Sequence, residues 1–313
     1  MNNIWIIGAG GIAEEYAKVL KSLNKSFIVI GRGNKSAEAF VEHTCVDVIT
    51  GGLDAFLTTI PRVAEYAIVA TPLSELADNT KKLMEFGVKN ILCEKPGFQS
   101  PDELQSVYDK SIKTGANVYY AYNRRFFTSV LKAQEIIAVD GGVKSFNFEF
   151  TEWGHLIEKS GNTEESLRNW FYANSTHVVD LAFYLGGNPI QLDCVTLGEL
   201  SWHKPAAFAG SGITDKGTIF NYAANWAAPG RWGVELLTSK HRLYLRPMEQ
   251  LQIQQLGSVA INPVELDDHL DKEFKPGFFL ETRAFLNGDF ERLCSIEEQY
   301  RHLSYYKQIL KHE

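Results

Sequence analysis

The sequence predicts an α/β protein with a doubly wound parallel sheet, followed by an α+β part with an open, mainly antiparallel sheet. Two observations carry this prediction. Over residues 1–121, short apolar runs alternate with amphipathic stretches, which is typical of a parallel sheet covered by helices on both faces. Later, above all over residues 217–256, strand-like runs follow one another with little helix between them. We therefore predict two domains, 1–121 and 122–313.

In the first domain, each strand candidate is a short apolar run that ends in turn or capping residues. The candidates are Trp5–Ile7, Phe27–Ile30, Asp47–Ile49, Tyr66–Ala70, Asn90–Cys93 and Val118–Tyr120. Helical periodicity fills most of the intervals between them, as at Leu76–Phe86 and Asp102–Lys113. This alternation indicates parallel strands that are connected by crossover helices.

The second domain is expected to begin with a helix near Ser129–Val139 and the alternating strand Val143–Glu152. Phe146, Phe148 and Phe150 share one face of this strand, which indicates that the face is buried. Further strands are expected at Thr218–Trp226, Trp232–Thr238, Arg242–Arg246 and Leu251–Gln255, and helices at Phe278–Asn287 and Ser295–Lys311. The pattern predicts a sheet whose second face meets solvent or a partner subunit.

The first strand runs directly into a glycine-rich turn, Gly8-Ala9-Gly10-Gly11-Ile12-Ala13. Gly8 permits a tight turn, and Gly10 lets the backbone approach a pyrophosphate without a Cβ in the way. Ala13 allows the next helix to pack close to the strand, and the N–H groups that begin this helix favour phosphate. The amphipathic helix Glu14–Leu20 supplies the context that a Rossmann dinucleotide site requires. The predicted phosphate-binding residues are Gly8, Gly10, Gly11, Ile12 and Ala13.

The second strand candidate, Phe27–Ile30, is not followed by the carboxylate that binds both ribose hydroxyls in NAD-selective sites. Arg32, Lys35 and Ser36 follow it instead, and an arginine can hold a 2′-phosphate through its fork of donors. We therefore expect NADP as the preferred cofactor and NAD as the alternative, with Arg32 and Ser36 in the binding site. The other interpretation is a solvated basic loop without a ligand.

Charge and composition argue against several classes of protein. A net charge of −7 and a pI near 5.7 argue against nucleic acid as the main partner. No apolar run has the length of a membrane helix, and we expect neither a membrane partner nor a signal peptide. The four cysteines are scattered and the eight histidines show no metal-ligand spacing, so we expect buried thiols in a cytoplasmic protein and no metal.

Five segments are informative together. They are Gly8–Ala13, Ala70-Thr71-Pro72, Glu94-Lys95-Pro96-Gly97, Tyr122-Asn123-Arg124-Arg125-Phe126 and His177-Val178-Val179-Asp180-Leu181. In this order and spacing, the segments resemble those of the Gfo/Idh/MocA oxidoreductases, the family of glucose–fructose oxidoreductase and inositol dehydrogenase. The resemblance implies NAD(P)-dependent hydride transfer to or from a carbinol or carbonyl carbon of a sugar, cyclitol or nucleotide sugar. It also implies that the second domain binds substrate and forms a homo-oligomer through its open sheet face.

Lys95 is the first catalytic candidate. It follows the strand candidate Asn90–Cys93 at the carboxyl edge of the predicted parallel sheet, where open α/β sheets bind ligands. Pro96 favours an extended Lys95 and can hold a cis bond, which would fix the direction of the ammonium group. The resemblance implies that Lys95 contacts both substrate and cofactor, where a cation stabilises developing alkoxide. The alternative is a surface lysine before a helix-starting proline.

His177 is the second candidate. The segment Asn174–Leu181 looks like a helix start with Asn174 or Ser175 as its cap. His177 and Asp180 share a helical face, so the carboxylate can orient an imidazole whose unperturbed pKa of about 6.5 suits proton transfer. The alternative is a purely structural pair. Many family members have an aspartate four residues before this histidine, where this chain has Ala173, and we expect Asn174 to position substrate instead.

The resemblance suggests roles for other residues. It implies that Ala70-Thr71-Pro72 passes the nicotinamide ribose and pyrophosphate, and that Glu94 contacts a cofactor hydroxyl unless it forms a structural salt bridge. Asn123 and Arg125 follow the last strand of the first domain and are expected to face the substrate. Arg124 and Arg125 can bind an acidic or phosphorylated group, although an interdomain ion pair is an equal alternative for one of them.

The predicted activity is that of a dehydrogenase or reductase acting on CH–OH groups, in a homodimer or homotetramer. One alternative keeps the cofactor but makes no net redox product, as in family members that hydrolyse or eliminate glycosides through transient oxidation. A second is a ligand-sensing regulator that kept the fold and lost turnover, although the presence of Lys95 and His177 favours an enzyme. A minor third is an imine-reducing or biliverdin-reducing relative.

Overall fold

The computed structural model describes residues 4–60 and 62–311, which divide into two compact units. Unit 1 contains the described residues up to Asn123 together with Leu270–Tyr300. Unit 2 contains Arg124–His269 and the described residues from Arg301 onward. The units differ from the predicted domains 1–121 and 122–313 chiefly in Leu270–Tyr300, because this late segment packs within unit 1.

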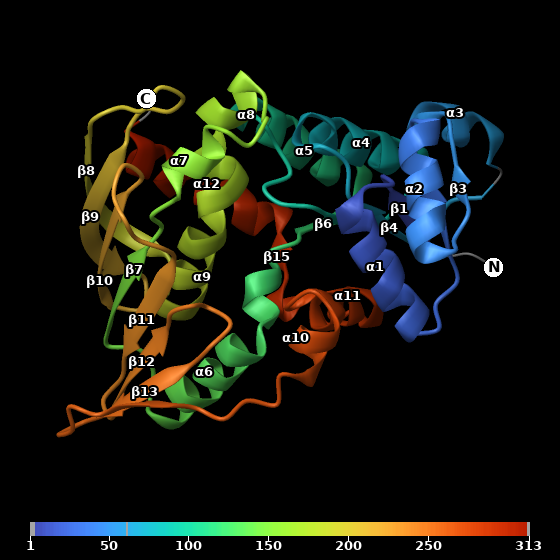
Figure 1. The fold of residues 1–313 in the computed structure, drawn as a ribbon. Helices are drawn as coiled ribbons and strands as arrows, with labels where there is room; N and C mark the ends of the chain where they lie inside the picture. Colours follow the sequence, from blue (N-terminus) through green and yellow to red (C-terminus); the bar gives the residue numbers. More distant parts are fainter. Residues whose placement is uncertain (1–3, 61, 312–313) are drawn as a thin grey trace. The chain divides into compact units, whose positions relative to one another are not determined.

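Unit 1 is built on a mainly parallel sheet with strand order β15-β6-β5-β4-β1-β2-β3 (Figure 1). The strands are β1 (Ile4–Ile7), β2 (Phe27–Ile30), β3 (Val48–Ile49), β4 (Tyr66–Val69), β5 (Asn90–Cys93), β6 (Asn117–Tyr120) and β15 (Cys294–Ser295). The helices are α1 (Gly11–Ser22), α2 (Asn34–Thr44), α3 (Gly52–Thr59), α4 (Leu73–Phe86), α5 (Pro101–Thr114), α10 (His269–Glu273) and α11 (Phe278–Asn287), with α10 beginning at the unit boundary. The parallel pairing confirms the predicted Rossmann sheet.

The segment Leu270–Tyr300 belongs to unit 1 because it completes the sheet and covers a helix. In β15, Cys294 and Ser295 pair antiparallel with Tyr120 and Tyr119 of β6. Helix α11 packs against α1, where the ring centroid of Phe278 lies 4.9 Å from that of Tyr16. The helix Phe278–Asn287 was predicted with these bounds, but its periodicity carried no information about which core it would cover.

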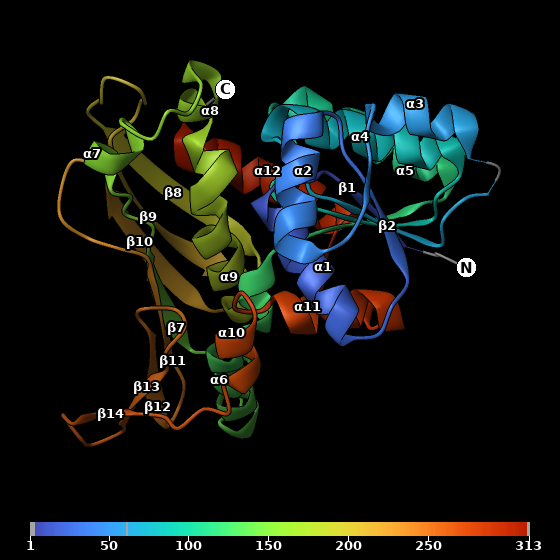
Figure 2. The same cartoon turned by 45° about the vertical axis from the view of Figure 1, so that its right-hand side comes forward.

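Unit 2 is built on a mainly antiparallel sheet with strand order β14-β13-β12-β11-β7-β10-β9-β8 (Figure 2). The strands are β7 (Ser145–Glu149), β8 (Pro189–Leu197), β9 (Ala207–Thr214), β10 (Ile219–Asn225), β11 (Gly233–Leu237), β12 (His241–Leu245), β13 (Gln252–Gln255) and β14 (Ile261–Pro263). The helices are α6 (Thr128–Val139), α7 (Gly154–Ile157), α8 (Glu164–Arg168), the π-helix η2 (Phe171–Ser175) and α9 (Thr176–Gly186). Helix α12 (Ile296–Leu310) and two 3₁₀ turns, η1 (Asn123–Phe126) and η3 (Phe290–Arg292), complete the chain. The exception to antiparallel pairing is β7 with β10, which run parallel.

An aromatic core holds α9 on this sheet. Phe146, Phe148 and Phe150 are buried on one face, as the alternating pattern of the strand predicted. Phe183 of α9 makes edge-on contacts with Phe146 and Phe148 at centroid distances of 6.0 and 5.5 Å. Gly186, the last residue of the helix, packs against the Phe146 ring, because a Cβ at this position would lie 2.2 Å from that ring. The core therefore fixes the helix that carries His177 and Asp180.

Strands β8 and β9 were not predicted. Strand β9 contains Gly210 and Gly212, which have low strand propensity. Both glycines are required by close neighbours: a Cβ would lie 2.4 Å from the Tyr222 ring at Gly210 and 1.9 Å from the Gln191 carbonyl oxygen at Gly212. These contacts are long-range, so the sequence pattern did not reveal them.

Two global expectations are tested by the described residues. None of the helices among them is both long enough and apolar enough to cross a membrane. All four cysteines are free thiols, and Cys93, Cys194 and Cys294 are buried, as their scattered positions predicted. Cys45 is the exposed member of the set.

Candidate functional site

A cavity of about 710 Å³ in unit 1 is lined by residues that follow β1, β2 and β4. It therefore lies at the carboxyl ends of parallel strands, which is the usual ligand position in this architecture. The predicted cofactor residues in its lining are Gly8, Gly10, Gly11, Ile12, Arg32, Ser36, Ala70, Thr71 and Pro72. Three other predicted cofactor residues, Ala13, Glu94 and Lys95, lie outside this lining.

The glycines of the turn serve different purposes: one is required by the fold, and two leave space beside the backbone. Gly8 has φ +117°, and a Cβ there would lie 2.3 Å from the carbonyl oxygen of Ala70, so the fold itself requires glycine. At Gly10 and Gly11, an added Cβ would meet no described atom within 4 Å. The open space beside these two residues and the first N–H groups of α1 fit a pyrophosphate. The glycine turn can therefore hold a dinucleotide.

Charged residues also line the cavity. Arg32 follows β2, is 78% exposed, and forms an ion pair with Glu75 in the first turn of α4. The Ser36 hydroxyl donates to the carbonyl oxygen of Gly33 at 3.1 Å. Glu75 was not predicted as a site residue, because it lies 43 residues after Arg32. Its one sequence signal is the position three residues after Pro72, at the start of a helix.

Ala13 and Glu94 are fixed inside unit 1. Ala13 is fully buried in α1, as expected for the close packing of this helix on the sheet. The hydroxyl of Tyr16 donates to Glu94 Oε1 at 2.8 Å. Burial raises the pKa of Glu94 and, more strongly, that of Tyr16. Glu94 thus has a structural hydrogen bond to a helix rather than the salt bridge considered from its sequence.

Lys95 lies two residues after the end of β5, at the carboxyl edge of the sheet. The Lys95–Pro96 bond is cis, as the sequence allowed. The carbonyl oxygen of Pro96 accepts from Gln299 Nε2 at 3.0 Å. Gly97 has φ +85°, and a Cβ there would lie 1.7 Å from the Tyr120 ring, so only glycine fits. Unit 1 therefore holds the backbone that carries Lys95 in a defined place.

Asn123 and Arg125, both expected to face a substrate, are buried and have protein partners. In unit 1, Asn123 Nδ2 donates to the carbonyl oxygen of Pro276 at 2.9 Å. In unit 2, Arg125 donates to both carboxylate oxygens of Asp180, from Nε at 2.9 Å and from Nη2 at 2.5 Å. Arg125 and Asp180 are each 1% exposed. The ion pair expected for one of the two arginines is thus formed by Arg125, and within unit 2.

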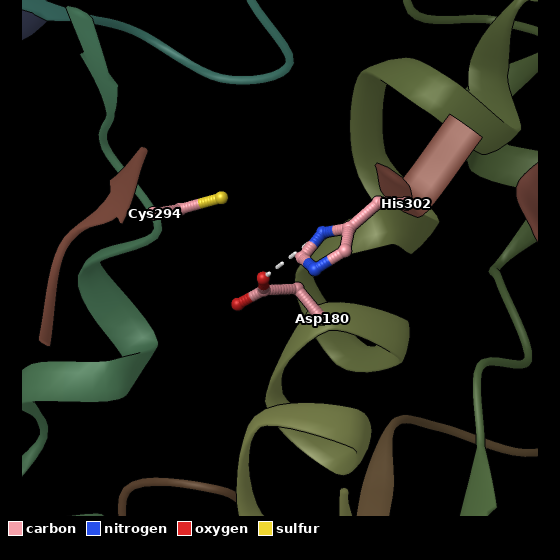
Figure 3. A group of neighbouring side chains, drawn as sticks. All are labelled: Asp180, Cys294 and His302. Carbon is pink, nitrogen blue, oxygen red and sulfur yellow. Dashed lines mark ion pairs between the residues drawn. The ribbon is translucent and has the colours of Figure 1, made fainter. Parts of the chain in front are cut away.

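Asp180 has a second charged neighbour. Nδ1 of His302 lies 3.7 Å from Asp180 Oδ1 (Figure 3). Asp180 was predicted to orient His177 from the same helical face, and this role stays a prediction; its ion-pair contacts include Arg125 and His302. A helical spacing identifies a shared face, but it cannot reveal partners that come from 55 or more residues away. Cys294, also drawn in Figure 3, belongs to unit 1.

His177 lies in the first turn of α9, directly after the π-helix η2. It is buried, and its ring centroid lies 6.1 Å from that of Trp232. Ser175 is the N-cap residue of α9, one of the two predicted, but it makes no side-chain capping hydrogen bond; its hydroxyl donates to Glu152 Oε1 at 2.8 Å instead. Asn174 Nδ2 donates to the same oxygen at 3.1 Å.

Glu152 was missed as a site residue. It follows β7 and is nearly fully buried, and burial raises the pKa of its carboxyl group. Its hydrogen bonds from Asn174 and Ser175 hold the segment that precedes His177. The available signal was a carboxylate at the end of the alternating phenylalanine strand, but its partners lie more than 20 residues away.

Aromatic rings and arginines surround Glu152. The guanidinium carbon of Arg231 lies 4.4 Å from the ring centroid of Trp232 and 4.8 Å from that of Trp153. Nη1 of Arg231 lies 3.6 Å from Glu152 Oε2. The guanidinium carbon of Arg124 lies 4.7 Å from the centroid of Trp232. These two tryptophans therefore pack against guanidinium groups.

Comparison with known proteins agrees with this geometry. Residues 2–122 match the Gfo/Idh/MocA model, described as "Oxidoreductase family, NAD-binding Rossmann fold". Residues 2–122 are therefore similar to the Rossmann part of the Gfo/Idh/MocA oxidoreductases. Glucose-6-phosphate 3-dehydrogenase of Bacillus subtilis (strain 168) is 26% identical over 197 residues, which are 59% of this chain and 54% of that protein. The match thus spans about half the length of this relative.

Solved structures extend the likeness of fold to nearly the whole chain. A levoglucosan dehydrogenase in complex with NADH matches with TM-score 0.81 at 16% identity, covering 99% of this chain and 96% of that one. UDP-N-acetylglucosamine 3-dehydrogenase from Acidithiobacillus ferrooxidans matches with TM-score 0.76 at 16% identity and the same coverage. At these identities the matches establish the two-part fold.

Proposed function

We propose that this protein is an NAD(P)-dependent oxidoreductase that transfers hydride between a nicotinamide cofactor and a carbinol or carbonyl carbon of a sugar, cyclitol or nucleotide sugar. The observation that carries the proposal is the cavity of unit 1, where the backbone beside Gly10 and Gly11 is open at the start of α1. The family match adds support. The cofactor, when bound, supplies or accepts the hydride.

The names of the similar proteins support the sugar class of substrate. One is a dehydrogenase of glucose 6-phosphate, one of levoglucosan, and one of UDP-N-acetylglucosamine. All three are therefore named for the oxidation of sugar derivatives. We carry over only the class, since these names differ in the substituents on the sugar.

Two residues are proposed to be catalytic. Lys95 of unit 1 stabilises negative charge on the carbinol oxygen, for which its place at the carboxyl edge of the sheet is suited. His177 of unit 2 takes and returns the hydroxyl proton. Asp180 supports His177 through α9, because its ion pair with Arg125 anchors that helix to the chain segment before α6. Asn174, oriented by Glu152, is proposed to position the substrate.

We propose NADP as the preferred cofactor. Arg32 and Ser36 line the cavity beside the end of β2, and Arg32 is exposed enough to meet a 2′-phosphate. Binding in this way requires Arg32 to leave Glu75 or to share its donors with it. The strength of the preference therefore depends on how well Glu75 competes with the phosphate.

The direct test is cofactor turnover on a panel of sugars, cyclitols and nucleotide sugars, with NAD and NADP in parallel. Stoichiometric formation of reduced cofactor with at least one substrate is the expected result. Product formed while the cofactor is only recycled would instead establish redox-neutral glycoside cleavage. Tight sugar binding without turnover on any substrate would identify a ligand-sensing regulator.

A homo-oligomer is also proposed, through one face of strands β8–β10. Exposed apolar side chains on this face are Val195, Leu197, Ile213 and Ile219. An apolar sheet face of this kind is typical of a subunit interface. Light scattering should give a mass of at least twice 35.2 kDa, and Ile219→Lys should shift it toward the monomer. A monomer at micromolar concentration would contradict the proposal.

A further inference from the structure

Helix α4 of unit 1 has an amide side chain on its buried face. The buried residues of this helix are Leu76, Ala77, Asn79, Thr80, Leu83 and Met84. An apolar side chain would continue this face at position 79, whereas a buried amide is costly unless the protein supplies a hydrogen-bond partner. Asn79 is 9% exposed and lines the cofactor cavity. The partner of its amide therefore indicates why an asparagine occupies this position.

That partner is the hydroxyl group of Thr71, which lines the same cavity. Asn79 Nδ2 donates to Thr71 Oγ1 at 3.2 Å. Thr71 comes two residues before the start of α4 and is partly exposed. It also lies beside the glycine turn, because a Cβ on Gly8 would come within 3.3 Å of its backbone nitrogen. The amide therefore holds a hydroxyl in the cavity lining, next to the turn that is proposed to bind the pyrophosphate.

The direction of this hydrogen bond decides what else the hydroxyl can do. A hydroxyl group accepts through its lone pairs and donates through a single O–H. Because Thr71 Oγ1 accepts from Asn79, its own hydrogen points elsewhere. Within residues 4–60 and 62–311, no group accepts that hydrogen, and α4 begins without a side-chain cap. The Thr71 hydroxyl therefore keeps its donor for a ligand in the cavity.

We propose that Asn79 is a positioning residue, which holds the Thr71 hydroxyl as a donor to an acceptor oxygen of the bound dinucleotide. The acceptor belongs to the pyrophosphate or to the ribose on its nicotinamide side. This inference rests on the proposed function and adds Asn79, which no sequence motif included, to the cofactor site. A hydroxyl that is already oriented loses less freedom when the ligand binds, and so contributes more to affinity.

The test is calorimetric titration of the full chain with ADP, ADP-ribose, NADH and NADPH. Thr71→Val removes the hydroxyl but keeps a side chain of similar shape, and it should weaken ADP-ribose binding about tenfold. An equal loss for ADP assigns the pyrophosphate as the acceptor, whereas a loss confined to the ligands with the second ribose assigns that ribose. Unchanged affinity for ADP-ribose would overturn the inference, because this ligand contains both acceptors.

Asn79→Leu tests whether the amide acts through Thr71. Leucine is similar in shape to asparagine and suits the buried face of the helix. The variant should weaken ADP-ribose binding about threefold by itself, but by less than about 1.5-fold in the Thr71→Val background, where the hydroxyl is absent. Equal losses in both backgrounds would overturn the positioning role, because Asn79 would then act on the ligand directly or through the fold.

Thr80→Val is the matched control for Thr71→Val. Thr80 follows Asn79 on the same helix, and its hydroxyl donates to the carbonyl oxygen of Leu76 at 2.8 Å. Since Thr80 is outside the cavity lining, its replacement should leave all four affinities unchanged. The melting temperature of each variant without ligand checks that it is folded.

Failure of this inference and failure of the proposed function give different results. Hydride transfer with dinucleotide affinities that are unaffected by Thr71→Val and Asn79→Leu would leave the oxidoreductase standing and remove the role of these two residues. Dinucleotide binding that depends on both residues, without hydride transfer on any substrate, would do the reverse. A folded wild-type protein that binds none of the four ligands would overturn both proposals.

Discussion

The cofactor cavity of unit 1 and the surroundings of His177 in unit 2 are built in different ways. The proposed phosphate-binding part of the cavity comes from one turn, residues 8–12, and consists mainly of backbone. The environment of His177 is made of side chains from distant segments, such as Glu152 and Trp232. A backbone site is therefore encoded locally, whereas a side-chain site depends on the folded sheet and helices around it.

The difference extends to stability. At Gly10 and Gly11 the cavity wall is open backbone, so changes there affect a ligand before they affect the fold. In unit 2 the buried charges of Arg125 and Asp180 must stay paired, because an isolated buried charge is strongly destabilising. Substitutions should therefore separate the two regions: binding defects in unit 1 and folding defects in unit 2.

The largest effect is expected at the buried ion pair. Arg125→Met leaves Asp180 buried without its bidentate partner, and should lower the free energy of unfolding by about 3–5 kcal/mol. Denaturant-induced unfolding measures the change. Arg168→Met is the control and should change stability by less than about 1 kcal/mol, since its ion pair is exposed. Equal stability of both variants would remove the contrast between the two regions.

The next effect concerns catalysis. Lys95→Ala should lower kcat by about 10²–10³-fold, the loss expected when one group that stabilises a developing oxyanion is removed. Steady-state rates with the best substrate measure it. Lys89→Ala is the matched control, because Lys89 precedes the same strand and its ammonium group donates to the Thr114 carbonyl oxygen. Unchanged turnover in Lys95→Ala would show that its catalytic assignment is wrong.

The glycine turn offers a comparison within unit 1. Gly8→Ala forces a positive φ and a contact with Ala70, and should destabilise the protein by about 1–3 kcal/mol. Gly10→Ala should leave stability within about 0.5 kcal/mol, because its Cβ meets no described atom, but should weaken cofactor binding roughly tenfold. Thermal melts and cofactor titration separate the two. Normal cofactor affinity in a folded Gly10→Ala protein would place the pyrophosphate elsewhere.

The smallest effects are expected at Arg32 and Glu75, the ion pair in the lining of the cavity. Arg32→Ala should lower the NADP-to-NAD ratio of kcat/KM by about tenfold, through loss of a charged hydrogen bond. Glu75→Gln should raise that ratio by at most about fivefold, because it removes an exposed competitor for Arg32. If neither variant changes the ratio, Arg32 does not bind a 2′-phosphate.

Much of unit 1 could be predicted because its signals are local. The turn at Gly8, the strand before Lys95 and the helix Phe278–Asn287 all follow from short apolar patterns and their neighbouring residues. Strand β9 could not be predicted in this way, because its glycines are required by close contacts with Tyr222 and Gln191 on the neighbouring strands. These contacts form only after the strands have paired.

The same limit applies to the candidate site. Lys95 and His177 were recognised from motifs, and the resemblance supplied their proposed roles. The ion pairs Arg32–Glu75 and Arg125–Asp180 join residues 43 and 55 positions apart, and no periodicity encodes such separations.

The late strand β15 has a consequence for how the chain folds as it is synthesised. Its partner, β6, ends at Tyr120, whereas β15 begins at Cys294. At a synthesis rate of about 5–20 residues per second, one edge of β6 stays unpaired for roughly 10–35 s before β15 leaves the ribosome. The nucleotide-binding sheet is thus begun first and completed last. Nascent chains arrested before residue 294 should need a chaperone that shields exposed strand edges.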